Sequence, residues 1–251
     1  MHHPLTSLNE ITPTARPGRR FEPTHERSLD GDLRVLATQL PGARKGVIVA
    51  AELAGPRGVA DLVAFTSTYP ALVDRIGRGG PFVLNETDCT VVAALSPKRA
   101  KTAVSVAAIT GISTEQVQRR LSRLASSGFV SAQSSGYSRR ADLQPIGRAY
   151  AFEAKVSNWQ QGLAQALRYA TWCDTSAVVL LKPPKDLSEV TATYSSLGVG
   201  LAVRSKWILR PRLGNPHPGL RLALSETLAF DISKSDLETF RGSVRLQNSA
   251  G

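Results

Sequence analysis

Cysteine is scarce in this sequence, which has 251 residues and only two cysteines, Cys89 and Cys173. The two lie far apart, and neither has another Cys or a His nearby at the spacing of zinc ligands. The sequence therefore argues against a structural zinc site. We expect two buried thiols in a reducing, cytoplasmic compartment.

Long apolar runs and the common phosphate-binding loops are missing as well. No apolar run is long enough to cross a bilayer, so we expect no membrane partner. Residues 1–20 lack the apolar stretch of a secretory signal. Neither a GxxxxGK(S/T) loop nor a GxGxxG turn occurs. The four histidines are scattered in arm or loop sequence, which argues against a histidine-based catalytic triad.

Acidic residues are in the minority. The sequence has 20 Asp and Glu against 31 Lys and Arg, which gives a formal net charge of +11. A strongly basic protein attracts a polyanion, and nucleic acid is the commonest one. Hydrophobic residues make up 42% of the chain, so it is globular, with the length of one large or two small domains. We therefore expect DNA as the partner, and the sequence leaves a homodimer open.

The first third of the chain has an arm, a helix and two strands. Residues 1–24 are rich in Pro, Arg and Thr and are expected to form a flexible basic arm. Residues 25–40 carry leucines at spacings of four, three and four, which is one face of a helix. Two valine-rich strands are expected at 46–53 and 58–66, joined by a turn at 54–57.

A helical block then interrupts the strands. Residues 67–84 are expected to be a connector, and strand character returns at 146. The other expected elements are helices at 86–95, 100–110 and 113–126, a hairpin within 128–143, a helix at 159–172, a strand at 177–181, a helix at 187–197, strands at 198–203 and 207–210, and a last helix near 233–240.

The block at 85–144 fits an inserted winged helix-turn-helix domain. Its first core-facing set is Ala103, Val106, Ala107 and Ile109, followed by Gly111, which permits a tight turn. In the next helix Ser113 is a good N-cap. The apolar face of that helix consists of Val117, Leu121 and Leu124.

The polar side of this second helix supplies candidates for DNA contact. Arginine and short polar side chains after a glycine turn suit a reader of the major groove. The tip of the wing is expected at 134–136, with two arginines after it placed to touch phosphate. A packing module with a solvated arginine face, or a protein-binding wing, is the alternative. The candidates are Thr114, Gln116, Gln118, Arg119, Arg120, Arg123, Arg139 and Arg140.

Three charged residues stand in strands that are otherwise apolar. Asp61 lies in VADLV, and Glu153 and Lys155 lie in FEAKV. Residues two apart in a strand share a face, so Glu153 and Lys155 project together. A charge in apolar surroundings is costly unless it is paired or bound to metal. Asp61 and Glu153 are therefore candidate ligands of Mg²⁺ or Mn²⁺, with Lys155 acting on the attacking water or the phosphate. The alternative is a surface ion pair with Asp61 as a turn cap.

These residues resemble the D…(D/E)xK signature of the PD-(D/E)xK nuclease superfamily, with Ala60 in place of the usual proline. Gln165 and Tyr169, in QALRY, look like the QxxxY motif of RecB-type nucleases, where the two side chains help to position DNA near the metal. The resemblance covers about 26–66 and 146–203. It implies an α/β fold with a restriction-endonuclease-like mixed sheet flanked by helices, divided into 25–84 and 145–251 by the inserted domain.

The family usually adds a carboxylate from the first helix. Glu26 is the best match by position, with Asp30 or Asp32 as substitutes. Glu52, at the end of the first strand, is a further candidate metal ligand.

The resemblance implies a metal-dependent deoxyribonuclease, directed to DNA by the winged helix. The alternative is a DNA-binding transcriptional regulator with an inactive nuclease-like domain. A structural partner-binding protein would explain the charge but not the acidic residues in the strands. The intact Asp61, Glu153 and Lys155 favour the nuclease.

Overall fold

The structure is a computed structural model that describes residues 8–11 and 28–234. Its contacts divide the chain into two compact units, and each is described by itself. The first, here called the sheet unit, comprises residues 1–69, 147–216 and 231–251. The second, the helical unit, comprises 70–146 and 217–230. The helical unit is thus longer than the block expected at 85–144, since it begins earlier and takes in a segment from far along the chain.

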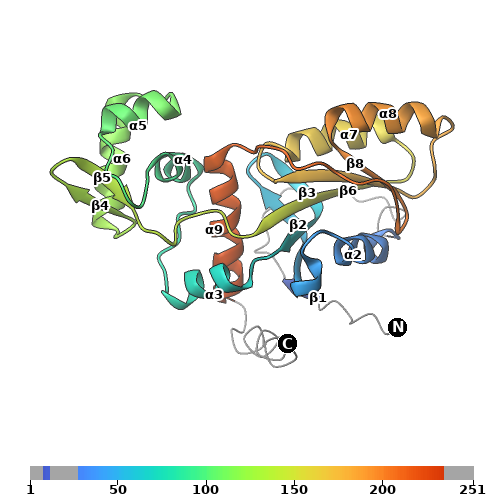
Figure 1. Ribbon diagram of the computed structural model, residues 1–251, viewed down its shortest axis with the longest axis horizontal. Helices are drawn as coiled ribbons and strands as arrows, with labels where there is room; N and C mark the ends of the chain where they lie inside the picture. Colours follow the sequence, from blue (N-terminus) through green and yellow to red (C-terminus); the bar gives the residue numbers. More distant parts are fainter. Residues whose placement is uncertain (1–7, 12–27, 235–251) are drawn as a thin grey trace. The chain divides into compact units, whose positions relative to one another are not determined.

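The sheet unit is built on a mixed seven-stranded sheet, so the protein is of the α/β class (Figure 1). The strand order is β1-β2-β3-β6-β7-β8-β9. The strands β6, β7 and β8 are mutually parallel, whereas β2 with β3, β3 with β6, and β8 with β9 are antiparallel. The strands are β1 Leu8–Ile11, β2 Val47–Gly55, β3 Gly58–Thr66, β6 Arg148–Lys155, β7 Thr175–Leu180, β8 Gly200–Val203 and β9 Lys206–Leu209.

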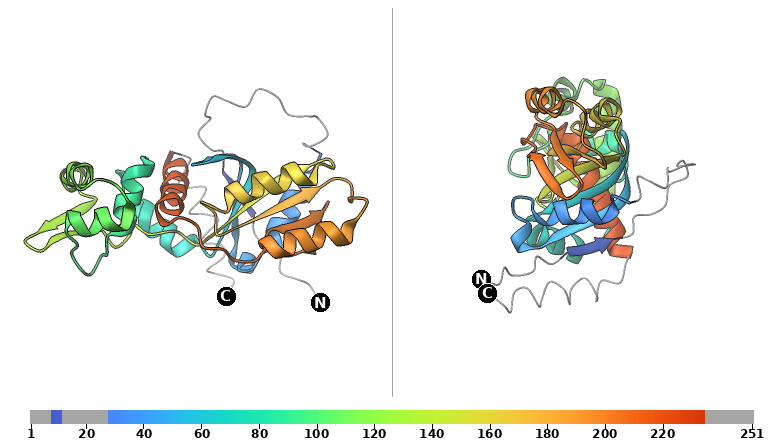
Figure 2. Two further views of the ribbon diagram at one scale, coloured as in Figure 1. Left: turned by 90° about the horizontal axis from the view of Figure 1, so that it is seen from above. Right: turned by 90° about the vertical axis from the view of Figure 1, so that its right-hand side faces the viewer.

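Helices cover both faces of this sheet (Figures 1 and 2). One face carries α2, Asp30–Thr38, and the other carries α7, Trp159–Tyr169, and α8, Leu187–Leu197. A short 3-10 helix, Ala43–Lys45, leads into β2. The alternation along β6 assigns its residues to the two faces: Phe152 and Ala154 pack with α2, while Glu153 and Lys155 belong to the face of α7.

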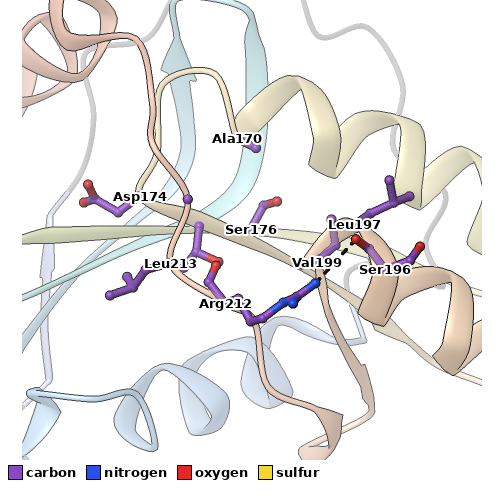
Figure 3. A pocket seen from close by; sticks show the side chains of 11 residues that line it. Ala170, Asp174, Ser176, Ser196, Leu197, Val199, Arg212 and Leu213 are labelled. Atoms are coloured by element: carbon purple, nitrogen blue, oxygen red, sulfur yellow. Dashed lines mark hydrogen bonds between the residues drawn. The ribbon is translucent and has the colours of Figure 1, made fainter.

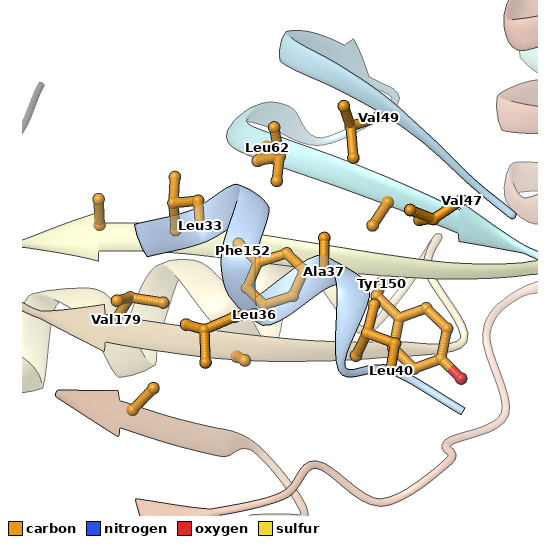
Figure 4. Close-up of a cluster of buried hydrophobic side chains, with 14 of the residues drawn as sticks. Leu33, Leu36, Ala37, Leu40, Val47, Val49, Leu62, Tyr150, Phe152 and Val179 are labelled. Carbon is orange, nitrogen blue, oxygen red and sulfur yellow. The ribbon is translucent and has the colours of Figure 1, made fainter. Parts of the chain in front are cut away.

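The core beneath α2 confirms the leucine periodicity. Leu29, Leu33, Leu36 and Leu40 are all buried and pack with strand residues such as Phe152 (Figure 4). A second core, between the sheet and α7 with α8, is built mainly from Leu, Val and Ala. The central strands β3, β6 and β7 are covered on both faces, and most of their positions are apolar.

The helical unit contains four helices, part of a fifth and a hairpin in the described residues: α3 Tyr69–Gly77, α4 Glu86–Ala94, α5 Ala103–Thr110, α6 Thr114–Ser126, most of α9 Pro218–Lys234, and the strands β4 Val130–Gln133 and β5 Gly136–Arg139. The expected Ser113 cap is present, since its Oγ accepts from Gln116 N at 3.3 Å. Gly111 has the left-handed conformation (φ 71°) between α5 and α6.

Four expectations about the elements were wrong. Residues 67–84 contain α3 and are not only a connector, and residues 8–11 of the expected arm pair with β2 as a strand. The long helix α9 was missed, and most of the last helix expected near 233–240 lies outside the described residues. Ile109 is 58% exposed, because its position in α5 is off the face shared by Ala103 and Val106.

No helix of the described residues is both long and apolar enough to cross a bilayer.

Neighbouring residues of α2 offer a matched test of this core. Leu36→Ala is expected to lower the free energy of unfolding by about 2–5 kcal/mol, because it leaves a cavity between α2 and the sheet. Val35 is 46% exposed, so Val35→Ala should change it by no more than about 0.5 kcal/mol. Urea unfolding followed by circular dichroism measures both. Equal effects of the two variants would contradict the placement of α2.

Candidate functional site

The candidate site lies where β3 and β6 part. Their pairing runs from Thr66 with Arg148 as far as Leu62 with Phe152. Asp61 is the next residue of β3, and its Oδ2 accepts from the backbone N–H of Ala154 at 2.6 Å. The Asp61 carboxylate thus satisfies the backbone N–H of Ala154, which has no partner in the ladder once the two strands separate. This contact brings Asp61 to the strand that carries Glu153, although 93 positions separate Asp61 from Ala154.

Glu153 is fully buried, with 0% of its surface exposed. Lys155 Nζ lies 2.7 Å from its Oε1, and the Tyr169 hydroxyl donates to its Oε2 at 2.6 Å. The same hydroxyl lies 2.7 Å from the carbonyl oxygen of Val59. The expected same-face placement of Glu153 and Lys155 is therefore confirmed, and the ion pair is buried, not superficial.

The surroundings raise the pKa of both Glu153 and Tyr169. Burial raises the pKa of Glu153, and the negative charge of Asp61 raises it further, while Lys155 and the Tyr169 hydroxyl oppose the shift. The pKa of Tyr169 is also raised, first by burial and then by the charge of Glu153. Tyr169 therefore remains a phenol, and so a hydrogen-bond donor, at neutral pH.

Helix α7 comes close to the sheet because of Gly162. A Cβ at this position would lie 2.7 Å from Val178 Cγ1 and 3.3 Å from Lys155 Cγ. Gln165 and Tyr169, four residues apart, follow on the same side of the helix. The Oε1 atom of Gln165 is buried and has no hydrogen-bond partner among the residues that the structure describes. A buried oxygen without a hydrogen-bond partner lowers the stability of the fold unless a water, a metal ion or a ligand provides the missing contact.

The tip of the β2–β3 hairpin packs against the end of the same helix. A Cβ at Gly55 would lie 2.5 Å from the ring of Trp172, which is fully buried, and one at Gly58 would lie 3.5 Å from Tyr169. The rings of Tyr169 and Trp172 meet edge to face with centroids 5.5 Å apart. Sequence analysis missed Trp172; the glycines at both ends of the hairpin turn were the signal for a close approach.

Of the other expected carboxylates, the two on α2 are not brought to this site. Asp30 and Asp32 lie on α2, which covers the opposite face of the sheet, and Glu26 lies outside the described residues. Glu52 lies across the β2–β3 ladder from Asp61, between the pairs Ala51–Leu62 and Leu53–Ala60, and it is exposed with a left-handed backbone (φ 50°). Within residues 8–11 and 28–234, no three His, Cys, Asp or Glu side chains gather in a metal-binding group.

In the helical unit, Asp88 of α4 holds two of the arginines of α6. Its Oδ1 accepts from Arg120 Nη1 at 2.7 Å, and its Oδ2 accepts from Arg123 Nη2 at 2.6 Å. Arg120 also donates to Asn85 Oδ1 at 3.3 Å. Both guanidinium groups are therefore fixed in direction, and each keeps donors that Asp88 does not occupy.

A hollow of about 290 Å³ opens between these arginines, lined by Gln116, Arg119, Arg120 and Arg123. The side chain of Arg119 is 69% exposed, and its ion-pair contact with Glu115 is long, at 3.8 Å. Thr114 is exposed, and Gln118 donates to the hydroxyl of Tyr137 at 2.8 Å. Three positive charges around one opening favour the binding of an anion in this hollow.

The two arginines expected at the wing are engaged within the unit. Arg139 donates from Nε to the carbonyl of Leu95 at 3.0 Å and from Nη1 to that of Leu143 at 2.5 Å. Burial lowers the pKa of Arg139. Arg140 forms a two-point pair with Asp142, at 3.0 and 2.5 Å. These guanidinium groups hold the hairpin to the helices and are less available to DNA than the arginines of α6.

A second hollow, of about 310 Å³, lies in the sheet unit near the beginning of β7 (Figure 3). Both of its charged residues are used by the fold: Arg212 donates to the carbonyl of Ser196 at the end of α8, and Asp174 accepts from Ala149 N. None of the candidate site residues lines it.

Comparison of the chain with models of protein families, with curated proteins and with solved structures finds no match in any of the three. The functional argument therefore depends on the geometry described above.

The hydrogen bonds of Tyr169 offer a test of the site. Tyr169→Phe is expected to lower the free energy of unfolding by about 1–3 kcal/mol, because the buried carboxylate of Glu153 then loses the hydroxyl as its donor. Tyr194→Phe, which removes a bond to the uncharged carbonyl of Trp159, should cost about 0.5–1.5 kcal/mol. Denaturant unfolding at pH 7 compares the two variants. A Tyr169→Phe protein as stable as the wild type would show that the phenol does not hold Glu153.

Proposed function

We propose that this protein is a metal-dependent nuclease that cleaves DNA phosphodiester bonds at Asp61, Glu153 and Lys155. The observation that carries the proposal is the buried Glu153, paired with Lys155 at 2.7 Å and set beside Asp61 on the neighbouring strand. Two carboxylates and an ammonium group in a largely buried place suit chemistry on a phosphodiester. A solvated surface ion pair, the alternative interpretation, does not agree with 0% exposure.

The residues present fit a hard divalent cation. Asp61 and Glu153 offer carboxylate oxygens, and Gln165 offers a buried oxygen without a hydrogen-bond partner in the described chain. Mg²⁺ is commonly held by one or two carboxylates and keeps several of its waters. When bound, Mg²⁺ or Mn²⁺ would supply a more acidic water and stabilise negative charge on the phosphate.

The other side chains have separate roles in this proposal. Lys155 donates hydrogen bonds to the attacking water or to a phosphate oxygen. Tyr169 is a positioning residue, because its hydroxyl holds one oxygen of Glu153. Gln165 contacts the substrate or the cation from α7. The restriction-endonuclease-like arrangement is proposed from the order α2, β2, β3, β6, α7, β7, with the helical block between β3 and β6.

Single substitutions separate these roles. Asp61→Ala, Glu153→Ala and Lys155→Ala are each expected to reduce cleavage by about 100-fold or more, because each removes a cation ligand or a charge on the phosphate. Gln165→Ala should give a smaller loss. Cleavage of plasmid and linear DNA with Mg²⁺, Mn²⁺ or EDTA measures the effect. Glu189→Ala, at an exposed carboxylate of α8, is the control and should keep wild-type cleavage.

The helical unit is proposed to be a winged helix that binds DNA. The hairpin β4–β5 follows α6 directly, and Lys101 pairs with Tyr137 as a third strand position, with both backbone bonds at 2.9 Å. The exposed face of α6 then supplies the groove contacts, and the arginines around the 290 Å³ hollow supply phosphate contacts.

This proposal predicts graded effects in α6. Arg119→Ala and Arg123→Ala should each weaken DNA binding and lower the slope of log K against log salt by about 0.9 for each phosphate that is no longer neutralised. Fluorescence anisotropy at several salt concentrations measures both quantities. Affinity and slope unchanged in both variants would indicate that the unit packs or binds protein instead.

Asp88→Asn provides a complementary variant. It removes the charge that restrains Arg120 and Arg123, so sequence-independent binding should become tighter and more dependent on salt. Glu86→Gln makes the same charge change two residues earlier on α4, at an exposed position, and should have a smaller effect.

A transcriptional regulator with an inactive nuclease-like domain is the second candidate. It is favoured by the lack of a third acidic ligand beside Asp61 and Glu153 in the described residues. Specific DNA binding by a wild-type protein that cleaves neither DNA nor RNA with Mg²⁺ or Mn²⁺ would select the regulator.

A further inference from the structure

The carboxyl ends of three parallel strands lie in register beside the candidate site. Lys155, the last residue of β6, pairs with Leu180 of β7, which pairs with Val203 of β8. Neighbouring strands are about 4.8 Å apart, so the row extends about 10 Å from Lys155 to the end of β8. Open α/β sheets commonly bind ligands at this end of their parallel strands.

Two exposed cations continue this row immediately after the strands. The backbone N–H of Lys182 donates to the carbonyl of Val156 at 3.0 Å, and that of Arg204 donates to the carbonyl of Leu180 at 2.8 Å. These bonds fix where the two side chains leave the sheet. The nearest acidic side chain along the loop is Asp186, whose carboxylate accepts from Glu189 N and caps α8.

Arg204 has an unfavourable backbone for its residue type. It begins the two-residue connection between β8 and β9, where Val203 pairs with Lys206, and its φ is 50°. Glycine adopts such a conformation without strain, whereas an arginine is strained there. In the described residues, no ion pair or side-chain hydrogen bond holds the guanidinium of Arg204. No such contact of this side chain therefore offsets the strain in its backbone.

We infer that Lys182 and Arg204 bind consecutive phosphates of the nucleic-acid strand whose scissile phosphate lies at Lys155. This inference rests on the proposed nuclease function and adds the path of the substrate: the strand crosses the carboxyl ends of β6, β7 and β8. Ammonium and guanidinium groups bind phosphate without regard to base sequence, so the path is independent of sequence.

The double variant Lys182→Ala/Arg204→Ala in the full chain tests the path. Its KM for cleavage of single-stranded DNA should rise about tenfold, with a much smaller change in kcat, because the two removed cations lie away from the reacting phosphate. Arg44→Ala/Lys45→Ala is the control. It removes the same charges before β2, at the edge where β6 begins, and should keep the wild-type KM.

Binding of a fluorescein-labelled single-stranded tetranucleotide separates this inference from the nuclease proposal. The strand is too short for a duplex reader, and the double variant should bind it about tenfold more weakly than the control does, with a salt slope lower by about 1.4. If the wild type does not cleave but this difference is found, Lys182 and Arg204 bind phosphates of the strand as inferred, and only the nuclease proposal fails. If cleavage and tetranucleotide binding match the control, the path is overturned and the nuclease proposal stands.

Arg204→Gly distinguishes a functional from a structural arginine. The variant should weaken tetranucleotide binding while its Tm stays equal or rises by roughly 2–4 °C, because glycine relieves the strain at φ 50°. A clear fall in Tm would show that the arginine serves the fold, and the inference would then be wrong.

Discussion

A carboxylate buried without access to water constrains most of the sheet unit. Burying the ionised carboxylate of Glu153 destabilises the fold unless cations and hydrogen-bond donors surround it. Lys155 supplies the cation because residues two apart in a strand share a face, and Gly162 leaves room for its stem beneath α7. Tyr169 supplies the donor from the end of α7. With Asp61 at the point where β3 leaves β6, one charged group thus fixes the spacing of a helix and two strands.

The same constraint explains which face of the sheet holds the candidate site. Residues of β6 alternate, so that Phe152 enters the leucine core under α2 while Glu153 points to α7. A carboxylate on α2 is therefore separated from Glu153 by the sheet itself. The oxygen-rich side of the site must come from β3, β6 and α7, and the unpartnered Oε1 of Gln165 lies on that side. This is why Asp30 and Asp32, the substitutes on α2 that the resemblance offered, do not agree with the geometry.

Features with a strict local period were predictable from sequence, and features made by distant contacts were not. The leucines of α2, the alternation of Glu153 and Lys155, and the Ser113 cap each follow from spacing along a few residues. Helix α9 was missed because it is buried on nearly all sides between Leu220 and Ile232, so it has no amphipathic period to detect. The partnership of Asp88 with Arg123 joins positions 35 apart, which no local pattern encodes.

Arginine content is a poor guide to which arginines meet a ligand. Arg75 is fully buried against Glu226, at 2.7 Å, and lies over the ring of Phe82 at 4.6 Å, and Arg221 is bonded to the carbonyl of Ile146. These side chains stabilise the helical unit and contribute little to a surface that DNA could contact. The net charge of +11 attracts polyanions at long range, but contact depends on those cations that the fold leaves exposed and does not hold in ion pairs or hydrogen bonds. Their positions in the sequence look no different from those of the buried ones, so only the structure separates the two kinds.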